Sequence, residues 1–349
     1  MTPTPSLIHH EDLAVGALRT FGAKVVTRDE IIAFARAFDP QPMHLDEAAA
    51  KQTLVGGLCA AGYHTCAIMM RLLYDGFLKD TTSLGSPGLD ETRWLRPVRP
   101  GDTLSLRLNV LEKRDLASRA DVGISRMTFE MLNQHGEPVL ATTSNQLLRR
   151  RHPREPSAAP APVSAPSRRP VALASLWDLP DVPPADPYGH YFEDRQIGEM
   201  ADLDSHTFTR DAIIAFATEF DPQPFHLDEV AAKQSLFGGL AASGWHTCAI
   251  YIRQFVAARQ SLEARIAAAG RPLAAYGPSP GFRNLRWLKP VLAGDTIGFR
   301  TRLADKVDLK SRPDRGLIAS ETQGRNQKGE IVFSVTGQIF VERRRPLGG

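Results

Sequence analysis

The spacing of apolar residues divides each half of the chain into a helical first part and a strand-rich last part. Apolar side chains recur at helical spacing over residues 31–38. Thr27 precedes this run in the position of a helix N-cap, and Glu30 completes a capping box with it. Residues 209–216 repeat the pattern behind Thr209. The sequence therefore predicts a helix near the start of each half.

A second, longer helix is predicted further along each half. Residues 56–79 pass from a crowded run of small residues to large apolar residues at helical intervals. This predicts a central helix at about Gly62–Lys79, and its repeat predicts one at about Gly244–Ala258. Small residues at a helix start allow close packing and let a ligand approach the backbone.

The last part of each half alternates apolar and polar residues, as strands do. A further strand is predicted at about Leu13–Val26. The pattern predicts an α+β fold in which helices pack on one face of an antiparallel sheet. The alternating segments are Thr103–Leu111, Ser125–Asn133 and Val139–Leu148 in the first half, and Thr296–Leu303, Ile318–Asn326 and Ile331–Val341 in the second.

The two halves are copies of one another. Residues 38–52 read FDPQPMHLDEAAAKQ and residues 220–234 read FDPQPFHLDEVAAKQ, an offset of 182. Later, RWLRPV at 93–98 aligns with RWLKPV at 286–291, an offset of 193, so the second copy has gained 11 residues around 265–280. A length of 349 residues suits two domains. We expect one at 1–150 and one at 188–349, joined by a Pro- and Ala-rich linker at 151–187.

Composition narrows the class of protein. Hydrophobic residues make up 42% and charged residues 23%, which is typical of a globular chain. The net charge of +3, with both signs interspersed, argues against a nucleic-acid partner. No apolar run approaches the roughly 20 residues that cross a bilayer, and the N-terminus lacks the pattern of a secretory signal. Three cysteines without metal-ligand spacing favour the cytoplasm and predict no metal site.

The repeated phrase carries candidate chemistry. Each copy holds an aspartate and a histidine five residues apart, Asp39 with His44 and Asp221 with His226, around a rigid Pro-Gln-Pro. Prolines fix their own φ and push the preceding residue into extended conformation. A carboxylate beside an imidazole forms an acid–base pair, because each stabilises the charged form of the other. A helix start nearby supplies free N–H groups for an oxygen that gains negative charge.

A structural interpretation of the same turn stays open. It reads the segment as a stiff connector between a helix ending near Phe38 and a short helix from about Leu45, in which Asp39 caps and His44 fills space. Duplication alone does not exclude it, because a structural turn would be copied as well. Two further histidines, His64 and His246, lie on the predicted central helices and are interpreted as structural.

The motifs resemble those of a known family. The pattern D-x-Q-P-[MF]-H-L-D, followed by G-G-L-x-A-x-G and later by W-L-[RK]-P-V-x-x-G-D, is similar to that of the MaoC-like dehydratases, the R-specific enoyl-CoA hydratase group. The resemblance covers both halves apart from the linker. It implies a hotdog fold in each half, a sheet wrapped around one long helix, and a double hotdog overall. The family usually has Asn where this chain has Gln41 and Gln223, and that amide helps to hold the histidine.

The resemblance also implies site residues and a reaction. The position before the family's oxyanion-hole glycine, often His, is Ala61 in one copy and Ser243 in the other. The implied reaction is reversible hydration of a trans-2-enoyl-CoA to an (R)-3-hydroxyacyl-CoA, with no metal or redox cofactor and with CoA only as part of the substrate. The family's catalytic Asp falls on Asp39 and Asp221, its His on His44 and His226, and its oxyanion-hole glycine on Gly62 and Gly244.

Because both copies keep all three residues, we expect two working sites in one chain, related by a pseudo-two-fold axis like that of a homodimer. Several points stay open from the sequence: the length of the acyl group, whether CoA or an acyl carrier protein bears it, which residue is the acid, and whether the pseudo-dimer pairs further.

Two other functions compete with the hydratase. Hotdog thioesterases usually carry a carboxylate on the central helix, where this chain offers only Asp75, far along the first copy. A non-catalytic acyl-binding protein would be indicated by loss of the Asp–His pair, and neither copy has lost it. Trp94 and Trp287 are interpreted as strand residues that close the pocket or core, and Asp102 and Asp295 as turn formers.

Overall fold

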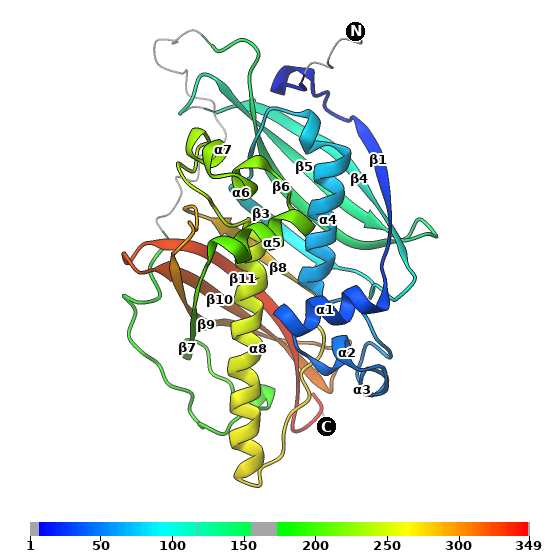
Figure 1. The fold of residues 1–349 in the computed structure, drawn as a ribbon. Coiled ribbons are helices and arrows are strands. Elements are labelled where there is room, and N and C mark those ends of the chain that lie inside the picture. The colour runs from blue at the N-terminus through cyan, green and yellow to red at the C-terminus, as the bar shows by residue number, and fades with distance from the viewer. Residues whose placement is uncertain (1–6, 117, 155–172, 348–349) are drawn as a thin grey trace.

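The computed structural model describes residues 7–116, 118–154 and 173–347 (Figure 1). The first half contains the 3₁₀ turns η1 (His10–Asp12) and η2 (Leu78–Asp80), the helices α1 (Arg28–Phe38), α2 (Pro42–Leu45), α3 (Glu47–Lys51) and α4 (Gly62–Gly76), and the strands β1 (Leu18–Val25), β2 (Ser83–Gly85), β3 (Gly88–Trp94), β4 (Thr103–Asp115), β5 (Val122–Leu132) and β6 (Pro138–Arg149).

Among the described residues, the second half repeats this order without counterparts of η2 and β2. It contains η3 (Phe192–Asp194), the helices α5 (Arg210–Phe220), α6 (Pro224–Leu227), α7 (Glu229–Gln234) and α8 (Gly244–Ala268), and the strands β7 (Met200–Thr207), β8 (Gly281–Trp287), β9 (Thr296–Asp308), β10 (Arg315–Asn326) and β11 (Ile331–Glu342). The predicted helices and strands are therefore present in both halves, with shifted ends.

All the strands belong to one antiparallel sheet. The strand order is β1-β4-β5-β6-β3-β8-β11-β10-β9-β7, and β2 pairs with β6 off this path. Read from its two ends, this order gives corresponding strands of the two halves. The halves join where β3 pairs with β8. At this junction Gly88 and Gly281 have φ of 149° and 152°, and a Cβ on either would collide with the backbone of the opposite strand. The arrangement has the pseudo-two-fold relation expected from the repeat.

The two central helices lie on the concave side of this sheet. In Figure 1 α4 and α8 stand in front of the strands, which curve behind them. The helices contact each other, α1 packs on α8, and α5 packs on α4. Side chains from both halves enter one hydrophobic core, which contains Phe34, Phe129, Phe216 and Phe299. The halves therefore share their interior instead of meeting only at their surfaces.

The lengths of the central helices differ from the prediction. The first ends at Gly76 instead of Lys79, Gly76 packs so closely on Phe21 that no Cβ would fit, and a 3₁₀ turn follows. The second continues ten residues past the predicted Ala258, to Ala268. The 11 residues gained by the second copy thus extend α8 and the loop that follows it.

The turn that holds the repeated aspartate is also shorter than predicted. Helical structure resumes at Pro42 instead of about Leu45, with proline in the first helical position, where its missing N–H costs nothing. Gln41 is extended, as predicted, while Asp39 has φ −147° and ψ 67°. Asp46 then caps α3 by accepting a hydrogen bond from the Ala49 N–H.

Much of the predicted linker, residues 155–172, lies outside the described residues. The part that is described before the second half packs on that half. Leu176 is buried, and its N–H donates to the Gln323 side chain on β10.

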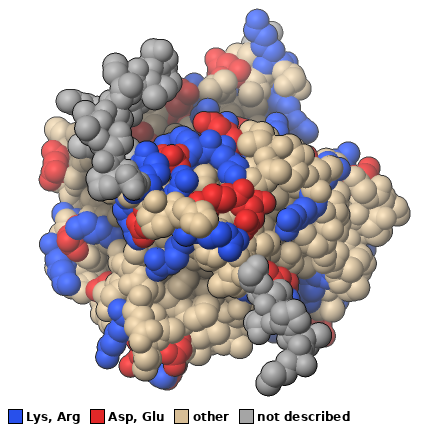
Figure 2. Space-filling model, turned by 90° about the horizontal axis from the view of Figure 1, so that it is seen from above, with Lys and Arg blue, Asp and Glu red and all other residues tan. Residues whose placement is uncertain are grey.

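On the face shown in Figure 2, basic and acidic side chains are interspersed, in keeping with the small net charge. Within residues 7–116, 118–154 and 173–347, no helix combines the length and apolarity needed to cross a bilayer.

Candidate active site

The first Asp–His pair lies at the join between two helices, and we call it site 1 together with Gly62. Asp39 is the C-cap of α1, and His44 lies on the single turn of α2. Both side chains are buried. The Asp39 Oδ2 atom is 3.8 Å from His44 Nε2. The proline-stiffened turn therefore brings the two side chains together, as the sequence predicted.

The surroundings fix how both side chains of site 1 are oriented. His44 Nδ1 lies 2.9 Å from the Cys59 carbonyl oxygen. Because a carbonyl only accepts, Nδ1 carries a proton and Nε2 is the atom that faces Asp39. The Gln41 amide donates to Asp39 Oδ1 at 2.7 Å. Gln41 thus acts on the aspartate, whereas the family resemblance led us to expect support of the histidine.

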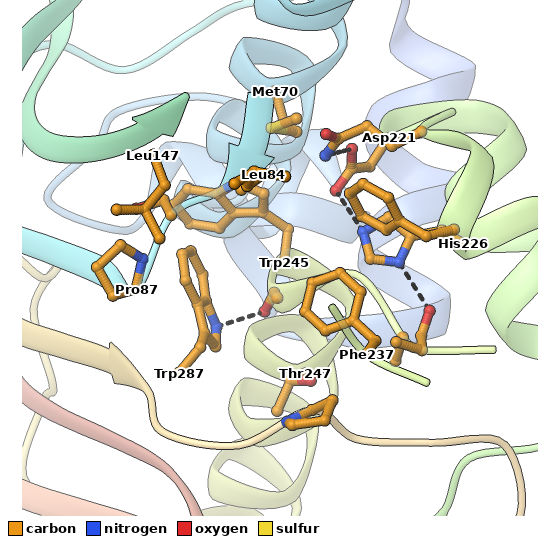
Figure 3. Close-up of a pocket in the computed structure, with 18 of the residues that line it drawn as sticks. Met70, Leu84, Pro87, Leu147, Asp221, His226, Phe237, Trp245, Thr247 and Trp287 are labelled. Atoms are coloured by element: carbon orange, nitrogen blue, oxygen red, sulfur yellow. Dashed lines mark hydrogen bonds and ion pairs between the residues drawn. The ribbon is translucent and has the colours of Figure 1, made fainter. Parts of the chain in front are cut away.

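The second pair has the same geometry with one added contact, and we call it site 2 together with Gly244. Asp221 Oδ2 lies 3.4 Å from His226 Nε2, and His226 Nδ1 lies 2.7 Å from the Ala241 carbonyl oxygen (Figure 3). The Gln223 amide donates to Asp221 Oδ1 at 2.9 Å. In addition, the Ser243 hydroxyl donates to Asp221 Oδ2 at 2.6 Å. Site 1 has Ala61 at that place, so the two sites hold their aspartates differently.

Each predicted oxyanion-hole glycine begins a central helix beneath a tryptophan. The Trp94 indole N–H donates to the Gly62 carbonyl at 3.0 Å, and Trp287 does the same to Gly244. A Cβ on Gly62 would lie 2.5 Å from the Trp94 ring, so only glycine fits. N–H groups in the first turn of a helix have no acceptor within the helix and carry the positive end of its dipole. Trp94 and Trp287 are strand residues that line these pockets, as predicted.

Each site opens into a cavity whose far wall comes from the other half of the chain. The site 1 cavity has a volume of about 490 Å³ and includes Tyr251, Ile252 and Phe255 of α8. The site 2 cavity has a volume of about 310 Å³ and includes the corresponding α4 residues, Met69, Met70 and Leu73. Figure 3 shows Met70, Leu84, Pro87 and Leu147 of the first half across from Asp221 and His226. Neither cavity is complete in one half alone.

Burial sets the electrostatics of site 1. It raises the pKa of the Asp39 carboxyl, while His44, the Gln41 amide and the Arg259 guanidinium each act to lower it. Burial also raises the pKa of the Cys59 thiol to about 11. The thiol therefore stays neutral at pH 7 and is a poor nucleophile.

The two other helical histidines lie in the core, which agrees with a structural role. His64 stacks on Phe34 with ring centroids 4.5 Å apart, and His246 stacks on Phe216 at 4.7 Å. Burial lowers the pKa of each to about 3, so both rings are neutral at pH 7. Neither lines a site cavity.

The remaining acidic candidates are accounted for by local structure. Asp75 is half exposed and pairs with Arg71 one helical turn earlier, so it is not the buried helix carboxylate of a thioesterase site. Asp102 and Asp295 accept backbone hydrogen bonds from residues three positions earlier, as turn formers do. Across residues 7–116, 118–154 and 173–347, no cluster of three or more His, Cys, Asp or Glu side chains is suited to a metal ion.

Several residues near the sites were not singled out from the sequence. They include Arg259, which donates to the Gln41 side-chain oxygen from the other half, and the backbone carbonyls that orient the two histidines. Arg259 lies one residue past the predicted end of the second central helix, and no sequence pattern predicted its contact with Gln41. Ser243 was singled out only as the residue before the helix start, and its hydrogen bond to Asp221 was not predicted.

Comparisons with known proteins agree with the fold and the repeat. The family model described as "MaoC like domain" matches residues 15–128 and again residues 193–322. A MaoC domain protein of Chloroflexus aurantiacus has a similar structure, with a TM-score of 0.75, 16% identity and coverage of 99% of this chain and 100% of that one. A conserved hypothetical protein of Mycobacterium tuberculosis, described as a double hotdog fold, has a TM-score of 0.68 at 14% identity, covering 96% of this chain and 98% of that one.

A sequence relative matches part of the chain. YdeM, an uncharacterised protein of Bacillus subtilis, is 30% identical over 141 residues, which are 40% of this chain and 98% of YdeM. The relative therefore matches about one of the two halves. The fold is an α+β double hotdog, and the two family matches together span more than half of the chain. The chain belongs to the MaoC-like dehydratase family, whose enzymes are of the hydratase and dehydratase type.

Proposed function

We propose that this protein catalyses the reversible hydration of a trans-2-enoyl thioester to the (R)-3-hydroxyacyl thioester, at both sites. The observation that carries the proposal is the buried pairing of Asp Oδ2 with His Nε2, at 3.8 Å in site 1 and 3.4 Å in site 2, each beside the free start of a helix. CoA is the expected carrier of the acyl group, and an acyl carrier protein is the alternative.

The Asp–His pair suits an addition reaction in which the enzyme accepts one proton from water and donates one proton to the substrate. The proposed mechanism needs one proton on the dyad besides the Nδ1 proton, on either the carboxylate or Nε2. When water adds to the β-carbon of the substrate, one partner accepts a proton from the water and the other delivers a proton to the α-carbon. The dyad ends with the same number of protons, so the reaction runs in either direction. This holds whichever partner acts as the base.

The helix start serves the thioester oxygen. That oxygen gains negative charge in the enolate-like transition state, and we expect the N–H of Gly62 or Gly244 to donate to it. One such donor contributes about 3 kcal/mol in well-studied enzymes. Positioning of the water and the alkene against each other supplies much of the rest.

The cavities suit an acyl chain. Their walls beyond the dyads are mainly apolar, and the side chains of the opposite central helix shape them. Apolar pockets with a few convergent polar groups are typical of small-molecule sites. The chemistry proposed requires only water and the thioester.

The test follows the loss of conjugated-enoyl absorbance when the protein is mixed with crotonyl-CoA and with a longer trans-2-enoyl-CoA. We expect activity in the wild type and none above background in the His44→Ala/His226→Ala variant. The matched control is His135→Ala/His152→Ala, which removes two exposed histidines outside the cavities and should keep full activity.

Two results would contradict the proposal. The first is a folded wild type that hydrates neither thioester, nor a branched or aromatic one. The second is release of free CoA, detected with a thiol reagent, at the rate at which absorbance is lost, since hydration leaves the thioester intact.

A further inference from the structure

The second half carries a helical extension that the first half lacks. Helix α8 has 25 residues and α4 has 15, and both begin at the corresponding glycine. Ala258 therefore corresponds to Gly76, and the α-helical residues 259–268 have no α-helical counterpart at the end of α4, where only the 3₁₀ turn η2 follows. The residue that corresponds to Arg259 is Phe77, the buried C-cap of α4. In Figure 1 α8 continues well below α1 toward the bottom of the view.

The first two residues of the extension donate hydrogen bonds to the turn of site 1. Arg259 Nη2 donates to the Gln41 side-chain oxygen at 2.8 Å, and the Gln260 amide donates to the Pro40 carbonyl at 3.0 Å. Arginine has only donors, so it selects the amide orientation in which Gln41 presents its NH₂ group to Asp39. A continuous chain of hydrogen bonds thus runs from Arg259 through Gln41 to the Asp39 carboxylate.

Arg259 is itself held in place. Its Nε lies 3.5 Å from a Glu263 oxygen one turn along α8, and its guanidinium lies 5.5 Å from the centre of the Tyr276 ring. The Tyr276 hydroxyl in turn accepts a hydrogen bond from Arg195 at 2.9 Å. The Arg259 side chain is only 12% exposed, so its interactions are weakly screened by water.

Site 2 lacks this connection. Gln223 donates to Asp221 as Gln41 does to Asp39, but among the residues that the structure describes no donor reaches the Gln223 side-chain oxygen. Helix α4 approaches site 2 through Arg71, which donates to the backbone carbonyls of Thr218 and Glu219 in the last turn of α5. That contact supports the helix end and does not touch the amide or the carboxylate.

We propose that Arg259 is a positioning residue for site 1 alone: it acts across the two halves, through Gln41, on the Asp39 carboxylate. The inference rests on the proposed function and deepens it, since it makes the two sites of one chain different. Site 1 depends on the α8 extension, and site 2 depends on its own Ser243. The helical extension of the second copy then supports a site of the first copy.

The charge of Arg259 also predicts how site 1 responds to pH. Burial raises the pKa of Asp39 and Arg259 opposes that rise, so removing Arg259 moves the titration of Asp39 to higher pH. The titratable and charged groups that bear on this carboxyl are His44 on α2, Arg259 on α8, Cys59 before α4, Tyr63 on α4 and, behind the arginine, Glu263.

The experiment uses chains with one intact site. His226→Ala leaves site 1, and His44→Ala leaves site 2. In the first background we expect Arg259→Met to lower kcat about tenfold and to change KM by less than about twofold. A tenfold loss in kcat corresponds to about 1.4 kcal/mol of activation free energy. The acid limb of the kcat/KM profile should move to higher pH, and Arg259→Lys, which keeps the charge, should restore much of that limb.

Three controls separate positioning from general damage. Arg259→Met should leave the site 2 background unchanged, and Arg265→Met, at an exposed arginine of the same helix, should change neither background. If Arg259 acts through Gln41, its substitution should add no further loss once Gln41→Leu is present. Equal loss at both sites, or an unchanged rate and pH limb at site 1, would overturn the inference.

A readout without turnover keeps this inference separate from the proposed function. In protein labelled with ¹³C at the aspartate carboxyls, the Asp39 signal is identified by its absence in Asp39→Asn. Its titration should move to higher pH in Arg259→Met and return toward the wild-type value in Arg259→Lys. A titration that does not move would refute the role of Arg259, whether or not the thioesters are hydrated. Failure of hydration with a shifted titration would refute only the proposed function.

Discussion

Ser243→Ala tests the difference between the two sites most simply. The substitution removes one buried hydroxyl and leaves the fold of the turn otherwise intact. Ser243 donates to Asp221 Oδ2 at 2.6 Å, and its oxygen accepts the Trp245 N–H at 3.2 Å as the N-cap of α8. Both the serine and the aspartate are almost fully buried. Water is therefore poorly placed to replace the lost partner.

The expected cost follows from these two contacts. A hydrogen bond to a charged group contributes about 1.5–3 kcal/mol net, and loss of an N-cap side chain costs about 1 kcal/mol. The variant should therefore lose about 2–4 kcal/mol of unfolding free energy. The rate at site 2 should fall about tenfold, because the Asp221 carboxylate loses the contact that holds it against His226.

Two measurements check these values. Urea unfolding at pH 7 gives the free energy, and we expect one cooperative transition because the halves share a sheet and a core. Hydration in the His44→Ala background gives the rate at site 2. The reciprocal variant, Ala61→Ser, supplies the matched comparison in site 1, where we expect a rate at least equal to that of wild type.

If Ser243→Ala changes neither the urea midpoint nor the rate at site 2, the Ser243 hydroxyl neither stabilises the fold nor positions Asp221. Loss of stability with full activity would limit Ser243 to its capping role.

Three further predictions follow from the same geometry. Gly62→Ala, which forces a Cβ against Trp94, should abolish hydration at site 1 in the His226→Ala background and cost about 1–3 kcal/mol in urea unfolding. Met70→Trp should narrow the site 2 cavity from the opposite half. The KM for a long-chain thioester should therefore rise in the His44→Ala background, where only site 2 is intact. It should stay unchanged in the His226→Ala background, where only site 1 is intact. Below pH 6.5 His64 and His246 become protonated in the unfolded chain, whereas in the folded chain they stay neutral down to about pH 3. The free energy of unfolding should therefore fall by up to about 1.4 kcal/mol per histidine for each pH unit below 6.5. Urea midpoints measured from pH 7 to 4.5 should show this slope, and His64→Phe/His246→Phe should flatten it.

The sequence predicted the features that depend on neighbours along the chain. Asp39 and His44 are five residues apart in a turn stiffened by two prolines, so their meeting is a local property, and the repeat predicted the same for Asp221 and His226. The order of helices and strands followed from their apolar spacing in the same way.

Features that depend on distant contacts were not predictable from those patterns. Gly76, the last residue of α4, packs on Phe21, which lies more than fifty residues away in the sequence. The orientation of Gln41 depends on Arg259, which lies 218 residues further along the chain. A periodic pattern states which face of a helix is buried, but it does not state which side chain of the other half lies against that face.

We propose that one chain carries two working sites, each completed by the other half. The decisive test compares the initial hydration rates of Asp39→Asn, Asp221→Asn and the double variant on one thioester. We expect each single variant to keep the activity of its intact site and the double variant to have none. If one single variant is as inactive as the double and the other matches wild type, only one site works and the claim is wrong.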